Sequence, residues 1–107
     1  MNDKILSLLG MARRAGKLEI GFACAKESFA SGKSYLVVCA DDISPKTFKE
    51  IEFFAAKSKN KELKVVKLSF ARETLSNAIG TSAACVAVCD IGFANRIFTL
   101  YNSGGTL

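Results

Sequence analysis

A stretch near the N-terminus that lies between two glycines carries the residue types that favour phosphate binding. One helical pattern ends before Gly16, and a second pattern begins directly after Gly21. The first amides of a helix have no intrahelical partner, and the helix dipole places partial positive charge at that end. Glycine also lets a ligand approach the backbone closely. The start of the second helix is therefore a candidate anion-binding site.

Basic side chains are expected around this helix start. Together with the backbone amides, such cations would attract the phosphates of a nucleic acid. Those near the end of the first helix also suit the negative end of its dipole, which gives them an equally good structural explanation. The basic residues in question are Arg13, Arg14, Lys17, Lys26 and Lys33.

The overall charge agrees with an anionic partner. The chain has 107 residues with 15 Lys and Arg against 10 Asp and Glu, which gives a formal charge of +5 and a pI of about 9.2. This balance favours a polyanion without requiring one. Lys4 interrupts the apolar N-terminal run and Arg13 and Arg14 follow it, so the run predicts neither a secretory leader nor a membrane span. We expect a cytoplasmic protein with no membrane association.

Catalytic motifs are weak. Gly32-Lys33-Ser34 resembles the end of a phosphate-binding loop, but Glu27 occupies the place of the first required glycine, and the motif precedes a strand instead of following one. The chain has no histidine, and no carboxylate stands with a specific partner. We therefore expect no catalytic residue, no cofactor and no enzymatic activity.

The aspartates and the cysteines each suggest a possible metal site. Aspartates at positions 41, 42 and 90 follow two strongly apolar strands, and a magnesium site there would require those strand ends to meet. Aspartate before a helix is commonly only a cap. The four cysteines lack zinc-ligand spacing, so we expect reduced thiols, no disulfide and no metal. These cysteines are Cys24, Cys39, Cys85 and Cys89.

Helical and strand patterns alternate along the chain. Continuous apolar segments rich in β-branched residues predict strands that helices cover on both faces. The alternation predicts one α/β domain over residues 1–107, with a small sheet between helix layers. The predicted helices cover 3–15, 22–31, 45–57, about 70–79 and a segment after 90, and the predicted strands cover 18–20, 35–40, 63–68 and 84–89.

Specific residues mark the expected helix ends. Ser44 followed by Pro45 predicts a capped start for the third helix, and Ser69 is expected to cap the fourth. Gly32 and Gly80 are natural C-terminal stops. Residues 102–107, which include two glycines, are expected to fray.

Several segments occur in the order and spacing of a known family. They are residues 8–18, Gly21, 31–38, 75–80 and 86–94. On these segments the chain resembles the ribosomal L7Ae/L30e superfamily of kink-turn RNA-binding proteins, and most of all its small bacterial YlxQ-type members. The resemblance implies a three-layer α-β-α sandwich on a mixed sheet.

The resemblance also implies where RNA would bind. In kink-turn binders, the helix that opens at the position of Gly21 carries polar residues two and three places on and a lysine six places on. These positions are Ala23, Cys24 and Glu27 here, so only Gly21 matches. A second RNA element, a loop with large apolar residues, is here the small-residue segment 81–84. Both departures predict weakened kink-turn specificity.

Residues and resemblance together predict a non-enzymatic, ribosome-associated RNA-binding protein. We expect a monomer that binds ribosomal or other structured RNA as a ribonucleoprotein, with ribosomal or translation-associated proteins as further partners. The alternative is a protein-interaction adaptor on the same fold, in which Phe22 and the helix face beside it meet a protein. The predicted RNA-binding residues are Arg13, Arg14, Lys17, Gly21, Phe22, Lys26, Lys33, Thr81 and Ser82.

Overall fold

A computed structural model describes residues 3–104, in which helices and strands alternate from end to end. None of these helices is long and apolar enough to cross a membrane. In chain order the elements are α1 (Asp3–Arg14), β1 (Leu18–Ile20), α2 (Phe22–Ser31), β2 (Leu36–Cys39), α3 (Pro45–Ala56), β3 (Lys64–Lys67), α4 (Arg72–Ile79), β4 (Cys85–Val88) and α5 (Ile91–Gly104).

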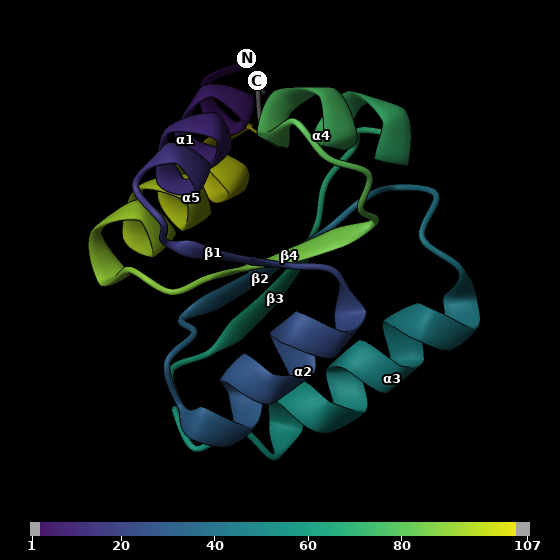
Figure 1. The fold of residues 1–107 in the computed structure, drawn as a ribbon, viewed down its shortest axis with the longest axis vertical. Coiled ribbons are helices and arrows are strands. Elements are labelled where there is room, and N and C mark those ends of the chain that lie inside the picture. The colour runs from purple at the N-terminus through teal and green to yellow at the C-terminus, as the bar shows by residue number, and fades with distance from the viewer. Residues whose placement is uncertain (1–2, 105–107) are drawn as a thin grey trace.

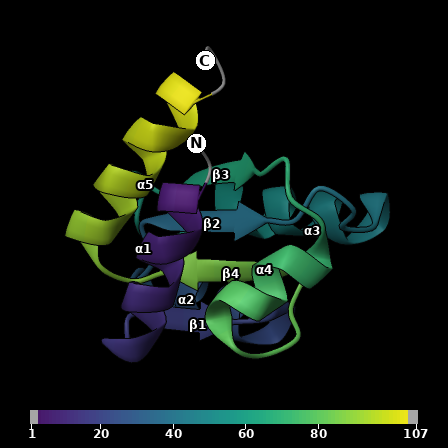
Figure 2. The same cartoon turned by 90° about the horizontal axis from the view of Figure 1, so that it is seen from above.

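The strands form one mixed sheet in the order β1-β4-β2-β3 (Figure 2). β4 is antiparallel to both of its neighbours, β1 and β2, whereas β2 and β3 are parallel. The register places Val86 opposite Ile20 on one side and opposite Val38 on the other. The last strand along the chain therefore lies inside the sheet, between β1 and β2.

Helices cover both faces of the sheet (Figure 1). α1, α4 and α5 pack on one face, and α2 and α3 pack on the other. Alternate residues of β2 enter the two cores: Leu36 and Val38 face the first group of helices, and Val37 and Cys39 face the second. The predicted three-layer α-β-α sandwich is confirmed.

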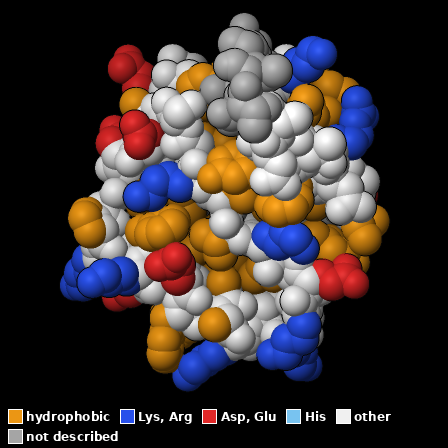
Figure 3. Space-filling view, turned by 180° about the vertical axis from the view of Figure 1, so that it is seen from behind, with side chains coloured by type: hydrophobic (Ala, Val, Ile, Leu, Met, Phe, Trp, Pro, Cys, Tyr) orange, Lys and Arg blue, Asp and Glu red, His pale blue; other side chains and the backbone are white. Residues whose placement is uncertain are grey.

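Lysines protect the edge strand β3. Lys64 Nζ lies 5.3 Å from the centroid of the Phe98 ring on one face of the sheet, and Lys67 Nζ lies 4.4 Å from that of Phe48 on the other. Charged lysines on an edge strand disfavour pairing with another chain. Figure 3, which views the molecule from this side, shows apolar side chains in the middle with basic and acidic groups interspersed. This face therefore carries no continuous basic patch.

Helix starts are capped partly as expected. Ser44 Oγ accepts a hydrogen bond from the Thr47 amide at 3.1 Å, as the sequence predicts. Ala71, and not Ser69, occupies the N-cap position of α4. The Arg72 amide instead donates to Asp42 Oδ1 at 2.7 Å, from the loop after β2. The cap comes from a residue that is distant in sequence and adjacent in the fold.

The antiparallel pairing of β2 with β4 also determines where the three aspartates lie. Asp41 and Asp42 follow β2, whereas Asp90 follows β4, which runs in the opposite direction. The two strand ends therefore lie at opposite ends of the sheet, and Asp90 Oδ2 accepts the Phe93 amide at 2.9 Å as a helix cap. No group of three metal-ligating residues occurs within the described part of the chain. The magnesium hypothesis fails on this geometry.

The C-terminal helix is longer than the sequence predicts. α5 continues through residues 102–104, so these residues are helical and not frayed. The remaining residues of the predicted tail, 105–107, lie outside the described part of the chain.

Two cysteines lie opposite each other inside the sheet. Cys39 on β2 pairs with Cys85 on β4, and both side chains are buried against α2 and α3. Burial raises the pKa of Cys39 to about 12 and that of Cys85 to about 11. Cys24 is exposed and Cys89 half-buried, and all four thiols are free.

These raised pKa values make stability depend on alkaline pH. A thiol that titrates near 9.0 when unfolded loses its proton there, while the folded chain keeps it until pH 11–12. The free energy of unfolding should therefore fall between pH 9 and 11, because the unfolded state binds fewer protons. Replacing Cys39 and Cys85 together by alanine should make the fall in the free energy of unfolding smaller by at least about 2 kcal/mol. Urea unfolding of both proteins at pH 8 and at pH 10.5 measures this difference. Parallel pH profiles for the two proteins would contradict the burial argument.

Candidate nucleic-acid interface

The start of α2 is the one expected anion-binding feature that the backbone builds directly. Gly21 occupies the N-cap position with φ 90° and ψ 166°, a conformation that strains any residue with a side chain. The first helical hydrogen bond is donated by Ala25 to the Gly21 carbonyl at 3.0 Å. The amides of Phe22, Ala23 and Cys24 therefore precede the first intrahelical bond.

The start of α2 differs in its capping from the starts of α3, α4 and α5. A side-chain oxygen accepts a first-turn amide in α3, α4 and α5, supplied by Ser44, Asp42 and Asp90. Among the described residues, no side chain does so for α2. Ala23 and Cys24 are exposed, and the space that a side chain on Gly21 would occupy is open. The amides at this end can bind an oxygen from outside the chain.

The loop between α4 and β4 lies beside this helix start. The Gly21 amide donates to the Cys85 carbonyl at 3.0 Å, which fixes the β1–α2 turn on the first residue of β4. Ser76 Oγ accepts the Ala83 amide at 3.0 Å and so holds the loop against α4. Both segments lie at the same end of the sheet in Figure 1. The structure thus brings the predicted loop residues, Thr81 and Ser82, to the end of the sheet where Gly21 lies.

Arg72 is a cation at this end of the sheet that sequence reasoning missed. Its guanidinium donates to Ser82 Oγ at 3.1 Å, and its positive charge partly opposes the rise in the Cys85 pKa. Arg72 is exposed and lies 51 positions from Gly21 along the chain. No local pattern connects the two residues, because the antiparallel pairing of β1 with β4 creates their proximity.

Lys26 and Phe22 lie one helical turn apart and share a contact with α3. Lys26 Nζ is 4.2 Å from the centroid of the Phe54 ring, and the Phe22 ring centroid is 6.2 Å from the same ring. Phe22 is half-buried in this cluster, whereas Lys26 is exposed. The cation is therefore held near the start of α2 by a cation–π contact and remains accessible to an anion.

Arg13 has a structural role at the end of α4. Its guanidinium donates to the carbonyl of Ile79, the last residue of α4, and lies against Gly80. The cation thus compensates the negative end of this helix and joins α1 to α4. Arg13 also flanks the start of the loop at 81–84, and both Arg13 and the adjacent Arg14 are exposed.

Lys17 lies at the other end of β1 from Gly21, and Lys33 follows the far end of α2. The Lys17 carbonyl accepts the Cys89 amide at 2.8 Å, where β1 begins and β4 ends. The backbone of Lys33 is about 15 Å from the start of α2, and its side chain forms an ion pair with Glu19 at 2.8 Å that raises the Lys33 pKa. Lys33 therefore reaches the β1 side of α2 with its charge paired, and Lys17 does not adjoin Gly21.

The outer face of α2 is partly acidic. Ala23, Cys24 and Glu27, the three positions that carry the kink-turn signature in related proteins, are all exposed. Cys24 and Glu27 line a hollow of about 220 Å³, to which Glu19 and Lys33 also contribute. Lys33 offsets the charge of Glu19 through their ion pair, whereas Glu27 brings a negative charge that opposes phosphate binding on the side of α2 next to β1. The cations nearest Gly21 lie instead toward α3 and α4.

Comparison with known proteins supports this assignment of the fold. The Ribosomal protein L7Ae/L30e/S12e/Gadd45 family model matches residues 3–97. The chain therefore belongs to this family. No relative was found among the curated proteins.

Two solved structures share the fold. A Bacillus halodurans protein of unknown function has a TM-score of 0.84 and 28% sequence identity, over 92% of this chain and 97% of that one. A 15.5kD RNA binding protein of Giardia lamblia has a TM-score of 0.75 and 15% identity, over 92% of this chain and 84% of that one. Both likenesses extend over most of the chain, and the second is a likeness of fold alone.

Substitutions of Arg13 and Arg14, two adjacent residues of α1, should have different effects on the free energy of unfolding. Arg13→Met removes a charged donor from the Ile79 carbonyl and should lower the free energy of unfolding by about 1–2 kcal/mol. Arg14→Met, the matched control, should change it by less than about 0.5 kcal/mol because Arg14 does not make the bond to the Ile79 carbonyl. Urea unfolding of the two variants measures both values. Equal losses would mean that the Arg13 contact contributes nothing specific.

Proposed function

We propose that this protein is a non-enzymatic RNA-binding protein that contacts structured RNA with the start of α2 and the α4–β4 loop. One observation carries the proposal: the first amides of α2 are uncapped and open to the outside, with the loop and Arg72 at the same end of the sheet. Membership of the L7Ae family and the fold shared with an RNA-binding protein support it.

The residues assigned to RNA fall into two groups. Backbone amides after Gly21 and the side chains of Lys26 and Arg72 would contact phosphates, because they offer donors or positive charge at one end of the sheet. Exposed hydroxyls at Thr81 and Ser82 would donate to sugar or phosphate oxygens. The half-buried Phe22 supports the site through its packing on α3.

The remaining predicted cations lie farther out. Arg13 and Arg14 border the site on the α1 side, where Arg13 is already bound to α4. A phosphate contact by Lys17 would need an RNA that extends to the other end of β1, and for such a contact Lys33 would have to leave Glu19. We therefore assign the central contacts to Gly21, Lys26 and Arg72, and the other cations to an extended RNA.

The same geometry argues for weak base specificity. Phosphate contacts position an RNA, whereas side chains that reach base edges select its sequence or fold. The positions available for such reading carry Ala23, Cys24 and Glu27, and the last of these brings a negative charge. We propose that the wild-type protein binds a kink-turn weakly and with little preference over a plain duplex.

The cellular role follows the family. We propose a cytoplasmic, ribosome-associated protein that acts as a monomer, without a cofactor, within a ribonucleoprotein. The ribosomal character of the family and the formal charge of +5 support this assignment. Ribosomal or translation-associated proteins would be its further partners.

Removing the Arg72 side chain should weaken RNA binding in a salt-dependent way. Each phosphate contact releases counterions, so Arg72→Ala should reduce the slope of log affinity against log salt by about 1. Arg72→Lys keeps the charge and should retain most of the slope. Titration of a structured RNA at several salt concentrations measures the effect.

Lys33 provides the matched control. Lys33→Ala removes the same charge but beyond the far end of α2, from a side chain that is paired with Glu19, so it should leave the slope nearly unchanged. A loss for Lys33→Ala as large as that for Arg72→Ala would contradict the proposed position of the RNA.

Restoring the family signature should raise kink-turn affinity. Glu27→Lys combined with Cys24→Glu and Ala23→Asn should increase the affinity for a standard kink-turn by about tenfold or more. Relief of charge repulsion on the order of 1–3 kcal/mol by Glu27→Lys should supply most of the salt-dependent part. Both proteins are titrated against the kink-turn and against a plain duplex.

Each outcome of this titration is decisive. A gain confined to the kink-turn supports the proposed docking of the RNA on α2. Tight and selective binding by the wild type would mean that other groups replace the signature, and no gain in the triple variant would mean that α2 does not meet RNA in the family manner.

A further inference from the structure

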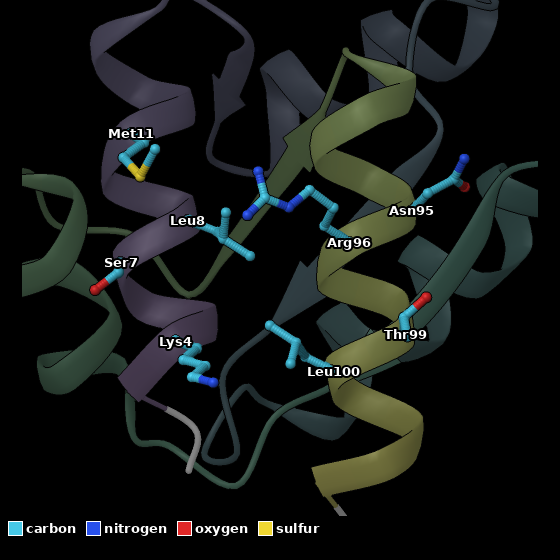
Figure 4. A pocket seen from close by; sticks show the side chains of 8 residues that line it. All are labelled: Lys4, Ser7, Leu8, Met11, Asn95, Arg96, Thr99 and Leu100. Atoms are coloured by element: carbon cyan, nitrogen blue, oxygen red, sulfur yellow. The ribbon is translucent and has the colours of Figure 1, made fainter.

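A groove on the opposite helix layer runs between α1 and α5. Its volume is about 630 Å³, a size at which proteins hold ligands or side chains of a partner. Figure 4 shows Leu8 of α1 facing Arg96 of α5, with Leu100 also directed toward α1. α1 contributes four lining residues and α5 the other four; they are Lys4, Ser7, Leu8, Met11, Asn95, Arg96, Thr99 and Leu100.

The apolar part of this groove is accessible. Met11 is 43% exposed, a high value for a large apolar side chain in the middle of a helix. Met11 and Ser7 also line a second hollow of about 430 Å³ on the α4 side of α1, which Arg14 borders. Met11 and Ser7 therefore separate two depressions on the outer face of α1, and Met11 is the exposed apolar side chain between them. Methionine is common at surfaces that adapt to a partner.

Basic residues predominate along this surface. Apart from Asp3, the first residue of α1, the two helices contain no Asp or Glu, and their basic residues are Lys4, Arg13, Arg14 and Arg96. By contrast, α2 and α3 mix basic and acidic residues along their length. No described acidic residue lines either depression. A partner that carries carboxylates beside apolar side chains would complement this surface.

We propose that the α1–α5 groove docks an amphipathic helix of a partner protein, with apolar anchors between Leu8, Met11 and Leu100 and with acidic residues facing Lys4 and Arg96. A helix laid in such a groove buries its apolar stripe at positions three and four apart. The sides of α1 and α5 offer no free backbone amides, because their N–H groups bond within the helices. This separates the groove from the phosphate-binding chemistry at α2.

The test uses a pair of model peptides and the whole protein. The first probe is a synthetic amphipathic peptide of about 18 residues with leucines along one stripe and glutamates beside it. The second carries lysines in place of the glutamates. The acidic peptide should bind at least about fivefold more tightly in fluorescence anisotropy, and its amide shift changes should fall on α1 and α5.

A charge swap sharpens the experiment. Lys4→Glu with Arg96→Glu should reverse the preference toward the basic peptide. Lys46→Glu with Lys49→Glu changes the net charge equally on exposed positions of α3 and should leave the preference intact. Met11→Ser should weaken both peptides about threefold or more through the lost apolar contact. Urea unfolding verifies that each variant is folded.

Several results would overturn the proposal. They are equal binding of the two peptides, shift changes centred on α2 or α3, and loss of the preference in the Lys46/Lys49 variant. Competition by a structured RNA for the acidic peptide, abolished by the Lys4/Arg96 swap, would assign the groove to nucleic acid and also reject it. The peptide result does not depend on Gly21 or Arg72, so failure of the RNA proposal leaves it unaffected.

Discussion

The antiparallel pairing of β4 with both β1 and β2 is the constraint on which the rest of the structure depends. β4 comes last along the chain but lies inside the sheet, so its ends meet segments from the first half of the sequence. Its first residue, Cys85, accepts the Gly21 amide, and Cys89, just beyond its other end, donates to Lys17. One strand thereby determines which loops share an end of the sheet. It also separates Asp42 from Asp90, which parallel strands would have brought together.

This constraint explains how far the sequence alone predicts the fold. Periodicity and end signals such as Pro45, Gly32 and Gly80 are local, and they locate the elements to within one or two residues, except for the C-terminal end of α5. Strand direction is not local, because an apolar run reads the same in either direction. The resemblance to a family supplied the mixed sheet. The Asp42 cap on α4 remained hidden, since a side chain 30 positions away replaces the local serine.

The candidate site shows the same division between local and distant information. The glycine start of α2 is visible in the sequence because a positive φ at an N-cap requires glycine. The distribution of cations around it is not visible. Lys33 is near Gly21 in sequence but lies at the far end of α2, whereas Arg72 is distant in sequence and binds the loop beside it. Sequence proximity thus located the glycine start of the helix but not Arg72, the cation that contacts the neighbouring loop.

In the proposed mode of RNA binding, the scaffold separates the two components of nucleic-acid recognition. Backbone amides at the start of α2 keep their direction whatever side chains follow, because Gly21 and its bond to Cys85 fix the turn. Side chains at positions 23, 24 and 27 can therefore change without removing the phosphate-binding donors. In this chain the three positions are small or acidic, so in the proposed mode of binding the side chains that would read bases contribute little while the backbone donors for a phosphate are present. On this proposal, affinity and selectivity rest on different atoms of one helical turn, and substitutions at these three positions alter selectivity first.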